Sequence, residues 1–275
     1  MTEYSLNEHD AFKQFERDGF NQIAVGYDAI AKVTSQVNEA ILDAVAIGPG
    51  LQVLDVACGT GWLSAAAVRR QAMVVGLDLA EDMLAIARSR CPEAKFYCGD
   101  AENLPFGEEQ FESVVCNLGI LHFSNPERAL AETFRVLKSG GHYAFTCWTP
   151  PTHNPFMKLI LSSVQTHGTM SLDLPLGPPL FRFGDSAECE RVLNARGFMS
   201  VSVIELPILW TFSAPEEVVP MLVTSSARLG AMLTRQAEEQ RHNIESAIVE
   251  GAKRYATNGS VKIPASVVLA VSCKP

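Results

Sequence analysis

The sequence has 275 residues, a formal net charge of −9 and a pI near 5.2, which argues against a nucleic-acid partner because phosphates are neutralised by lysine and arginine. No apolar run is long enough for a transmembrane segment, and the N-terminus lacks the basic and apolar regions of a signal peptide, so we expect a cytoplasmic protein. The seven cysteines are widely spaced, without a CxxC or Cys/His cluster, which predicts reduced thiols and no metal site.

The first half of the chain alternates helical and strand patterns. Apolar residues at helical spacing occupy Ala11–Ile47, a segment expected to pack beside the binding pocket. Strands are predicted at about 51–57, 73–77, 95–98, 111–117 and 142–148, with helices between them. Asn125 and Pro126 predict a capped helix that Gly140 and Gly141 are expected to end. The alternation predicts one α/β sheet.

The second half adds two strands and a helical insertion. Asp185 opens a helix that runs toward Gly197, and a sixth strand is predicted at about 198–206. Residues 213–216, Ser-Ala-Pro-Glu, match a capping box and predict the start of the insertion. Within the insertion, residues recur at helical spacing at Ile244, Ile248, Gly251 and Tyr255. The apolar run 265–271 is the predicted seventh strand.

The most informative stretch is 53–61, Val-Leu-Asp-Val-Ala-Cys-Gly-Thr-Gly, which predicts a strand running into a glycine turn that opens a helix. A ligand lying against main chain needs residues without a Cβ at the closest approach, and Gly59 and Gly61 supply them. Asp78 lies nineteen positions after Gly59, at the end of the second strand, where a carboxylate can reach both ribose hydroxyls. The pattern therefore predicts an adenosine-containing ligand.

Further residues discriminate between adenosine cofactors. Asp55 lies four residues before the first glycine, where its carboxylate would repel a pyrophosphate but suit an ammonium group. Ser64 stands where dinucleotide binders have their third glycine. A third element, Gly-Asp-Ala-Glu-Asn-Leu-Pro-Phe at 99–106, follows the third strand. A dinucleotide is therefore disfavoured.

On these residues the chain resembles class I S-adenosylmethionine-dependent methyltransferases, especially the ubiquinone/menaquinone-biosynthesis-like, small-molecule branch. Asp-Val-Ala-Cys-Gly-Thr-Gly at 55–61 is similar to the family's first motif, with Ala57 at a position that is often glycine. The likeness continues through 76–79, 99–106 and 137–141. The resemblance implies S-adenosyl-L-methionine as the cofactor and S-adenosyl-L-homocysteine as the product, and it does not identify the acceptor.

The resemblance also implies a fold: an α/β, Rossmann-like seven-stranded methyltransferase sheet, mostly parallel with an antiparallel last strand, with N-terminal helices and a helical lid inserted before that strand. We expect residues 1–275 to form a single methyltransferase domain, with 20–150 as the cofactor-binding core and 151–184 and 212–260 as an acceptor lid. Such a lid would roof the carboxyl ends of the strands, where open α/β sheets bind ligands. The turn-rich segment 175–181 is either a loop that closes over the cofactor or a surface connector.

The resemblance assigns roles to several residues. Asp55 would support the methionine ammonium, Asp100–Ala101 would contact the adenine, and Asn117–Leu118 would meet the methionine portion. For the acidic residues, capping of a local turn or helix is the structural alternative. The expected cofactor-binding set is Tyr27, Asp55, Ala57, Cys58, Gly59, Thr60, Gly61, Trp62, Asp78, Leu79, Met83, Asp100, Ala101, Glu102, Asn117 and Leu118.

Apolar and aromatic members of this set have their own alternatives. Tyr27 resembles an aromatic residue that the family places over the carboxylate end of the cofactor, near which Thr60 and Trp62 are also expected. Leu79 and Met83 would line the adenine if Asp78 binds the ribose. Ordinary core or helix packing would explain the apolar side chains equally well.

A sulfonium methyl group is transferred by in-line displacement to a nucleophilic O, N, C or S, so the protein mainly aligns the acceptor and excludes water. If the acceptor is a hydroxyl, a base assists, and His122 is the best-placed candidate because its loop follows the fourth strand. A structural or pocket-lining role is the alternative. His153 and His167, in the expected lid segments, are weaker candidates.

Large apolar side chains gather in or beside the expected lid, at Trp148, Phe156, Phe181, Phe183, Trp210, Phe212 and Met221. They favour a small hydrophobic or aromatic acceptor, and the lid's own core is the competing explanation.

Two other functions stay open. A cyclase or isomerase can bind the same cofactor without methyl transfer, and the glycines alone also fit an NAD(P)-dependent oxidoreductase. A non-catalytic interaction module is a third possibility. Homo-oligomerisation is compatible with the sequence and not encoded in any motif.

Overall fold

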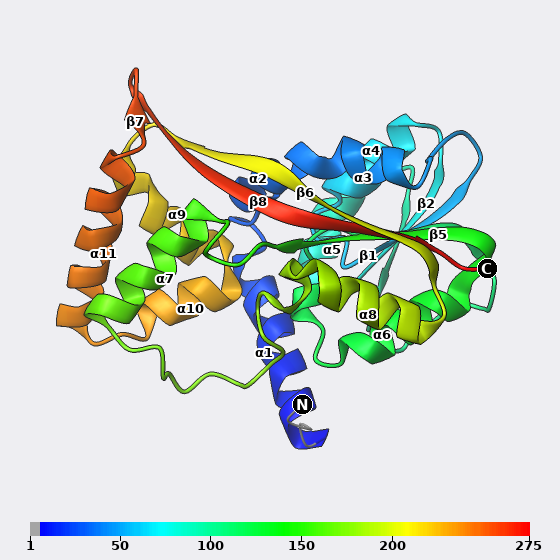
Figure 1. The fold of residues 1–275 in the computed structure, drawn as a ribbon, viewed down its shortest axis with the longest axis horizontal. Coiled ribbons are helices and arrows are strands. Elements are labelled where there is room, and N and C mark those ends of the chain that lie inside the picture. Colours follow the sequence, from blue (N-terminus) through cyan, green and yellow to red (C-terminus); the bar gives the residue numbers. More distant parts are fainter. Residues whose placement is uncertain (1–5) are drawn as a thin grey trace.

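The computed structural model describes residues 6–275, and the N-terminal residues used for the signal-peptide expectation lie outside the described residues. A mixed sheet with the order β3-β2-β1-β4-β5-β8-β6 runs through the molecule, and β7 pairs with β8 (Figure 1). The strands are β1 Gln52–Val56, β2 Met73–Asp78, β3 Lys95–Cys98, β4 Phe111–Cys116, β5 Leu137–Trp148, β6 Met199–Phe212, β7 Ala256–Thr257 and β8 Ser260–Cys273.

The first five strands are parallel, whereas β8 runs antiparallel to both β5 and β6. This confirms the predicted mostly parallel sheet with an antiparallel last strand; the short β7 is an addition to it. The central strands are buried on both faces, as the consecutive residues Val53 and Leu54 of β1 illustrate, because their side chains point to opposite faces. Because both faces are covered, these strands appear in the sequence as continuous apolar runs.

The helices are α1 Leu6–Ile23, α2 Asp28–Thr34, α3 Asn38–Ala44, α4 Trp62–Arg69, α5 Glu81–Arg90, α6 Pro126–Val136, α7 Pro155–His167, α8 Ser186–Arg196, α9 Val218–Ser225, α10 Ala227–Thr234 and α11 Glu238–Lys253. Single 3₁₀ turns are η1 Ser35–Val37, η2 Ile120–His122, η3 Arg182–Gly184 and η4 Pro215–Glu217. In Figure 1, α3 and α4 lie above the sheet and α6 and α8 below it. Among these described helices, none is both long and apolar enough to cross a membrane.

Side-chain caps begin two helices as predicted. Asn125 Oδ1 accepts a hydrogen bond from the Arg128 N–H at 3.0 Å at the start of α6. Asp185 Oδ1 accepts one from the Ala187 N–H at 2.9 Å at the start of α8, which ends at Gly197 with φ of +96°.

The helical spacing predicted over Ala11–Ile47 is present as α1, α2 and α3, whereas two other local predictions are wrong. Helix α6 ends at Val136, and Gly140 lies in an irregularity of β5, where its φ of +77° fits the bulge. At the insertion, Glu217 rather than Glu216 closes the turn, because its carboxylate accepts the Ser213 N–H at 2.9 Å.

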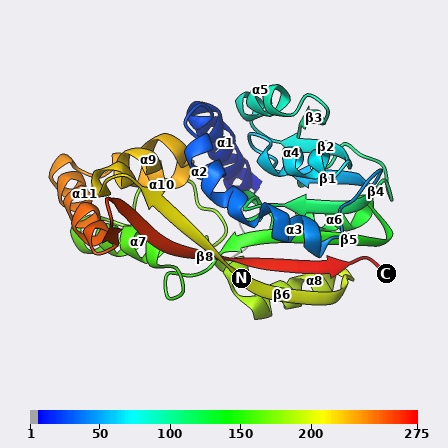
Figure 2. The same ribbon diagram turned by 90° about the horizontal axis from the view of Figure 1, so that it is seen from above.

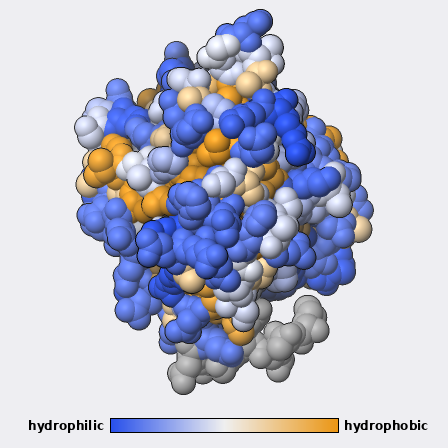
Figure 3. Space-filling model, turned by 90° about the vertical axis from the view of Figure 1, so that its left-hand side faces the viewer, coloured by the Kyte–Doolittle hydropathy of each residue, from blue (hydrophilic) through white to orange (hydrophobic). Residues whose placement is uncertain are grey.

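A group of helices, α7 and α9–α11, packs around the far ends of β6 and β8, which extend well beyond the parallel strands (Figures 1 and 2). We call these helices the helical cover. Helix α7 packs against α11, and α9 packs against α10 and α11. The outer face on this side is mainly hydrophilic, with apolar bands between the polar side chains (Figure 3). The cover therefore has its apolar side chains largely turned inward.

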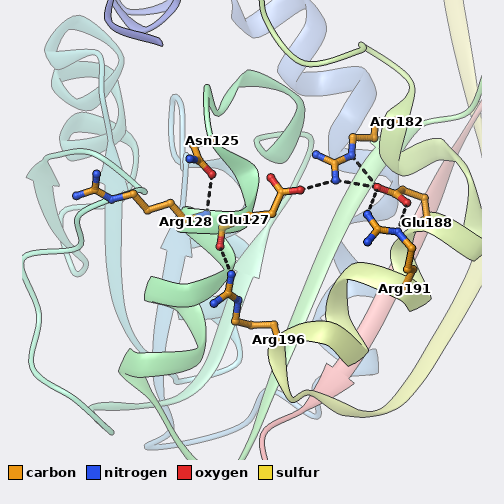
Figure 4. A network of polar contacts seen from close by, with 7 residues as sticks. All are labelled: Asn125, Glu127, Arg128, Arg182, Glu188, Arg191 and Arg196. Carbon is orange, nitrogen blue, oxygen red and sulfur yellow. Dashed lines mark hydrogen bonds and ion pairs between the residues drawn. The ribbon is translucent and has the colours of Figure 1, made fainter. Parts of the chain in front are cut away.

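A polar network fixes the loop that links α7 to α8. Arg182 at the end of this loop pairs with Glu127 of α6 and with Glu188 of α8, and Glu188 also binds Arg191 (Figure 4). The Arg196 guanidinium donates to the main-chain oxygen of Glu127 at 3.1 Å. Because these ion pairs tie the end of the loop to α6 and α8, the residues just before Arg182 have a defined position.

Candidate functional site

The glycine turn after β1 adopts a left-handed backbone at several residues. Gly59 has φ of +52° and Gly61 has φ of +81°, and even Ala57 has φ of +57°. A Cβ on Gly61 would lie 3.0 Å from Ala87 Cβ of α5, so this glycine permits α4 and α5 to approach. A Cβ on Gly59 would approach the Tyr27 ring at 3.4 Å. The turn thus keeps main chain open toward Tyr27.

Asp78 organises this turn from the end of β2. Its Oδ2 accepts the Gly59 N–H at 2.8 Å and its Oδ1 accepts the Ala80 N–H at 2.9 Å. Burial raises the pKa of Asp78, while these main-chain hydrogen bonds and nearby His122 oppose the rise. The carboxylate also lines a cavity, and its oxygens retain lone pairs that can accept hydrogen bonds from a ligand.

Asp55 is buried below the turn. Its Oδ2 accepts a hydrogen bond from Ser64 Oγ at 2.6 Å, which explains why a serine occupies the place of a third glycine. Burial raises the pKa of Asp55 to about 7.

Asp28, which the sequence reading did not single out, ties α2 to the turn. Its Oδ1 accepts hydrogen bonds from Thr60 Oγ1 at 2.9 Å and Trp62 Nε1 at 3.1 Å, and Arg90 completes the group. Burial alone would raise the pKa of Asp28, but these donors hold it below its ordinary value. Thr60 and Trp62 therefore have structural partners within the chain.

A second ion-pair group lies after β3. Lys13 of α1 pairs with Asp100 at 2.8 Å and with Glu102 at 2.7 Å. Glu102 is 3% exposed and also accepts hydrogen bonds from Ser124 Oγ and the Asn125 N–H. Both acids thus tie α1 to the turn after β3, Glu102 also holds the loop before α6, and both line a cavity.

The end of β4 is shaped by a third group. Asn117 Nδ2 donates to the Thr34 main-chain oxygen and to Asn38, while its Oδ1 accepts from Thr146 Oγ1 at 2.6 Å. Leu118 has φ of +57°. This bend directs the following residues, including η2, toward the same cavity.

The first cavity has an empty volume of about 690 Å³, including its open mouth. It brings together twelve of the predicted residues: Tyr27, Ala57, Gly59, Asp78, Leu79, Met83, Asp100, Ala101, Glu102, Asn117, Leu118 and His122. Asp55, Cys58, Thr60 and Trp62 line a smaller cavity, which shares Tyr27, Ala57, Gly59 and Asn117 with the first. Gly61 lines neither of these and packs on α5.

Sequence reasoning missed the α1 contribution to the first cavity: Lys13, Glu16, Arg17 and Phe20. They follow an i, i+3, i+4, i+7 spacing, so one helix face carries them all. This stripe of charged and aromatic residues is the sequence pattern from which the contribution of α1 to the cavity could have been predicted.

The second cavity adjoins the first and has an empty volume of about 1040 Å³. Phe20, Tyr27, Leu118 and His122 line both cavities. Of the seven large apolar residues predicted beside the lid, Trp148, Phe156, Phe181 and Trp210 line the second cavity. The others do not line it, and Phe183 and Phe212 are buried in the core.

Segment 175–181 contributes Leu180 and Phe181 to the second cavity rather than closing over the first. A Cβ on Gly177 would clash with the Phe12 ring, so this segment packs on α1.

The histidines differ in position. His122 Nδ1 lies 2.9 Å from Oε2 of the buried Glu16, and its ring meets Phe20 edge to face at 4.9 Å. His153 contacts Glu205 at 3.4 Å and His167 is exposed, and neither lines the two cavities. The structure therefore does not support these two as bases.

All seven cysteines are free thiols, and burial raises the pKa of Cys58 well above its ordinary value. Within residues 6–275, no group of three or more His, Cys, Asp or Glu side chains is arranged to hold a metal ion.

The sequence is similar to proteins of known families. Residues 54–145 match the methyltransferase domain family. A demethylmenaquinone methyltransferase of Renibacterium salmoninarum is 37% identical over 142 residues, which is 50% of this chain and 60% of that protein. The chain thus spans about three fifths of the length of this relative.

Solved structures extend the likeness to the whole fold. A Bacillus halodurans structure described as a methyltransferase superposes with a TM-score of 0.56 at 23% identity and covers 87% of this chain and 99% of its own. A [4+2]-cyclase superposes with a TM-score of 0.53 at 19% identity, covering 88% and 81%. Residues 54–145 thus carry a methyltransferase domain, and these likenesses support a class I methyltransferase, whose cofactor is S-adenosyl-L-methionine.

The first cavity fits this cofactor. The left-handed turn at Gly59 leaves main chain uncovered where a Cβ would approach Tyr27, and the Asp78 carboxylate stands beside it. Leu79, Met83 and Ala101 supply apolar walls on the same side.

Proposed function

We propose that this protein transfers a methyl group from S-adenosyl-L-methionine to a small hydrophobic or aromatic acceptor. The observation that carries the proposal is the pair of adjoining cavities, which share Phe20, Tyr27, Leu118 and His122. A donor in the first cavity and an acceptor in the second would meet at these residues, so their reacting atoms would be held together. The methyltransferase relatives support this reading.

In this proposal Asp78 binds the ribose hydroxyls, and Asp100–Ala101 with Leu79 and Met83 surround the adenine. Asn117–Leu118 and the turn after β1 hold the methionine portion, with Asp55 supporting its ammonium group from below. The bound cofactor supplies an activated methyl group. The chain's own task is to orient the acceptor and exclude water, for which the apolar second cavity is suited.

We further propose that the chain acts as a single methyltransferase domain in the cytoplasm, where seven free thiols stay reduced. Residues 151–184 and 212–260 form its acceptor lid, since α7, α9, α10 and the loop before η3 line the second cavity.

The test is incubation with methyl-labelled S-adenosyl-L-methionine and a small-molecule extract, followed by mass spectrometry of labelled products. We expect labelled apolar products together with S-adenosyl-L-homocysteine. Cofactor binding measured by calorimetry, with conversion of an extract component that gains no label, would indicate the cyclase or isomerase instead. Binding of NAD(H) in place of S-adenosyl-L-methionine would contradict both.

A further inference from the structure

His122 lies where the two cavities meet. It comes from η2, directly after β4, and it lines both cavities. Its side chain is 26% exposed, so the imidazole is accessible from the cavities without facing bulk solvent freely. The Phe20 ring packs against it edge to face at 4.9 Å and limits rotation of the imidazole.

Glu16 fixes the other side of this imidazole. The carboxylate comes from α1, 106 residues earlier in the chain, and its Oε2 lies 2.9 Å from His122 Nδ1. A carboxylate only accepts hydrogen bonds, so the contact requires the proton on Nδ1 and leaves the Nε2 lone pair of the neutral ring available. A base held in one tautomer by an acid is the arrangement that proton removal requires.

Glu16 differs from the acid beside it. Glu102 is 3% exposed and has Lys13, Ser124 and the Asn125 main chain as partners. Glu16 is 2% exposed, and its Oε1 is buried without a hydrogen-bond partner in the described chain. A buried carboxylate that only fastened α1 to η2 would be expected to satisfy both oxygens, so this one calls for a functional explanation.

We propose, on the basis of the function proposed above, that Glu16 positions His122 as the base that takes the proton of a hydroxyl group on the acceptor. The acceptor oxygen bonds to the methyl carbon, the carbon–sulfur bond breaks with its electron pair staying on sulfur, and the hydroxyl proton passes to His122 Nε2. The resulting imidazolium is paired with the Glu16 carboxylate, and the products are a methyl ether and a neutral thioether.

A hydroxyl is the acceptor that this arrangement suits. A phenolic group keeps its proton near neutral pH, since its pKa is about 10, whereas a neutral amine attacks through a free lone pair and needs no prior deprotonation. The substrate class is therefore an apolar molecule that carries a phenolic or enolic hydroxyl, sized for the second cavity.

The first test reads the tautomer directly and needs no acceptor. Protein with ¹⁵N-labelled histidine is compared by NMR as wild type, Glu16→Gln and Glu205→Gln. We expect His122 in the Nδ1–H form in wild type and a shift toward the Nε2–H form in Glu16→Gln. Glu205→Gln is the matched control, because Glu205 contacts His153 Nδ1 at 3.4 Å outside both cavities, and it should leave His122 unchanged. An Nε2–H form in wild type would overturn the proposal.

The second test uses ¹³C-methyl S-adenosyl-L-methionine with the small-molecule extract. We expect wild-type products whose labelled carbon resonates as O-methyl. His122→Gln should form them about 10²-fold more slowly and Glu16→Gln about tenfold more slowly, with a loss of rate larger than any change in the cofactor dissociation constant. Label found only on nitrogen, sulfur or carbon, or a wild-type rate in His122→Gln, would overturn this proposal alone. Absence of any labelled product would overturn the proposed function as well.

Discussion

The two cavities are built in different ways. The first is lined mainly by residues that directly follow β1, β2, β3 and β4, so consecutive short motifs bring its walls together. The second draws its walls from α1, α2, α7, α9 and α10, the ends of β5 and β6, η2 and the loop before η3. The first is therefore encoded by local sequence, whereas the second exists only after long-range packing.

Charge differs between the cavities as well. The first cavity contains acids, of which Asp78 and Asp100 use main-chain N–H donors or Lys13 as partners. The second is mostly apolar, and among residues 6–275 its ionisable wall residues besides Tyr27 are His122 and Arg228. Shifted pKa values should therefore be concentrated around the first cavity, and this difference between the cavities can be tested.

The largest expected effect is the pH dependence of stability caused by Asp55. Its folded-state pKa of about 7 exceeds the unfolded value, so the folded protein binds more protons between about pH 4 and 7 and the free energy of unfolding falls as the pH rises. The loss approaches about 4 kcal/mol above pH 7 as an upper limit. Urea unfolding of wild type and Asp55→Asn across this range measures it. We expect the free energy of unfolding to depend less on pH in Asp55→Asn than in wild type. Parallel pH dependences in the two proteins would contradict a raised pKa of Asp55.

The next effect concerns the glycine turn. Gly61 and Gly50 have nearly the same φ, +81° and +77°, but only a Cβ on Gly61 would meet another helix, at 3.0 Å from Ala87 Cβ. Gly61→Ala should cost about 1–3 kcal/mol more unfolding free energy than Gly50→Ala, because it adds overpacking to backbone strain. Chemical denaturation of both variants gives the difference. Equal losses of unfolding free energy in the two variants would show that α5 does not pack tightly against Gly61.

The sequence predicted most of the cofactor half for a physical reason. Glycines, turn-forming acids and apolar strands act over a few residues, so Gly59, Asp78 and the strand positions followed from local chemistry. Gly140 was misjudged because a glycine after a helix can equally serve a bulge in the next strand. Such errors are local and do not alter the topology.

The acceptor half was predictable only in outline. Capping residues and apolar spacing located helices near the predicted places, yet nothing in the sequence states that Glu16 meets His122 or that Lys13 bridges Asp100 and Glu102. These pairs are 87 to 106 residues apart, and without aligned relatives no pattern links them. Phe183 and Phe212 likewise became core rather than cavity wall because burial depends on the packed neighbours.

Removal of the Asp78 carboxylate tests the cofactor side of the comparison. Asp78→Ala should weaken S-adenosyl-L-methionine binding about 10- to 100-fold, since a charged hydrogen bond is worth about 1.5–3 kcal/mol. Calorimetry measures the dissociation constant. Asp173→Ala is the control, because Asp173 is exposed and lines neither cavity. An unchanged constant in Asp78→Ala would remove the ribose contact from the proposal.

The smallest expected effect tests whether the two cavities act separately. Met232 of α10 lines only the second cavity, so Met232→Trp should fill acceptor space without touching the cofactor walls. We expect labelled product to form at least about tenfold more slowly, since misfit by a few atoms in an apolar pocket is worth that much, while the dissociation constant for S-adenosyl-L-methionine is unchanged. Met199→Trp makes the same exchange at an exposed position of β6 and should behave as wild type. A normal rate in Met232→Trp would mean that the acceptor lies elsewhere. Parallel losses of rate and cofactor affinity would mean that the shared residues couple the cavities, because Phe20, Tyr27, Leu118 and His122 belong to both.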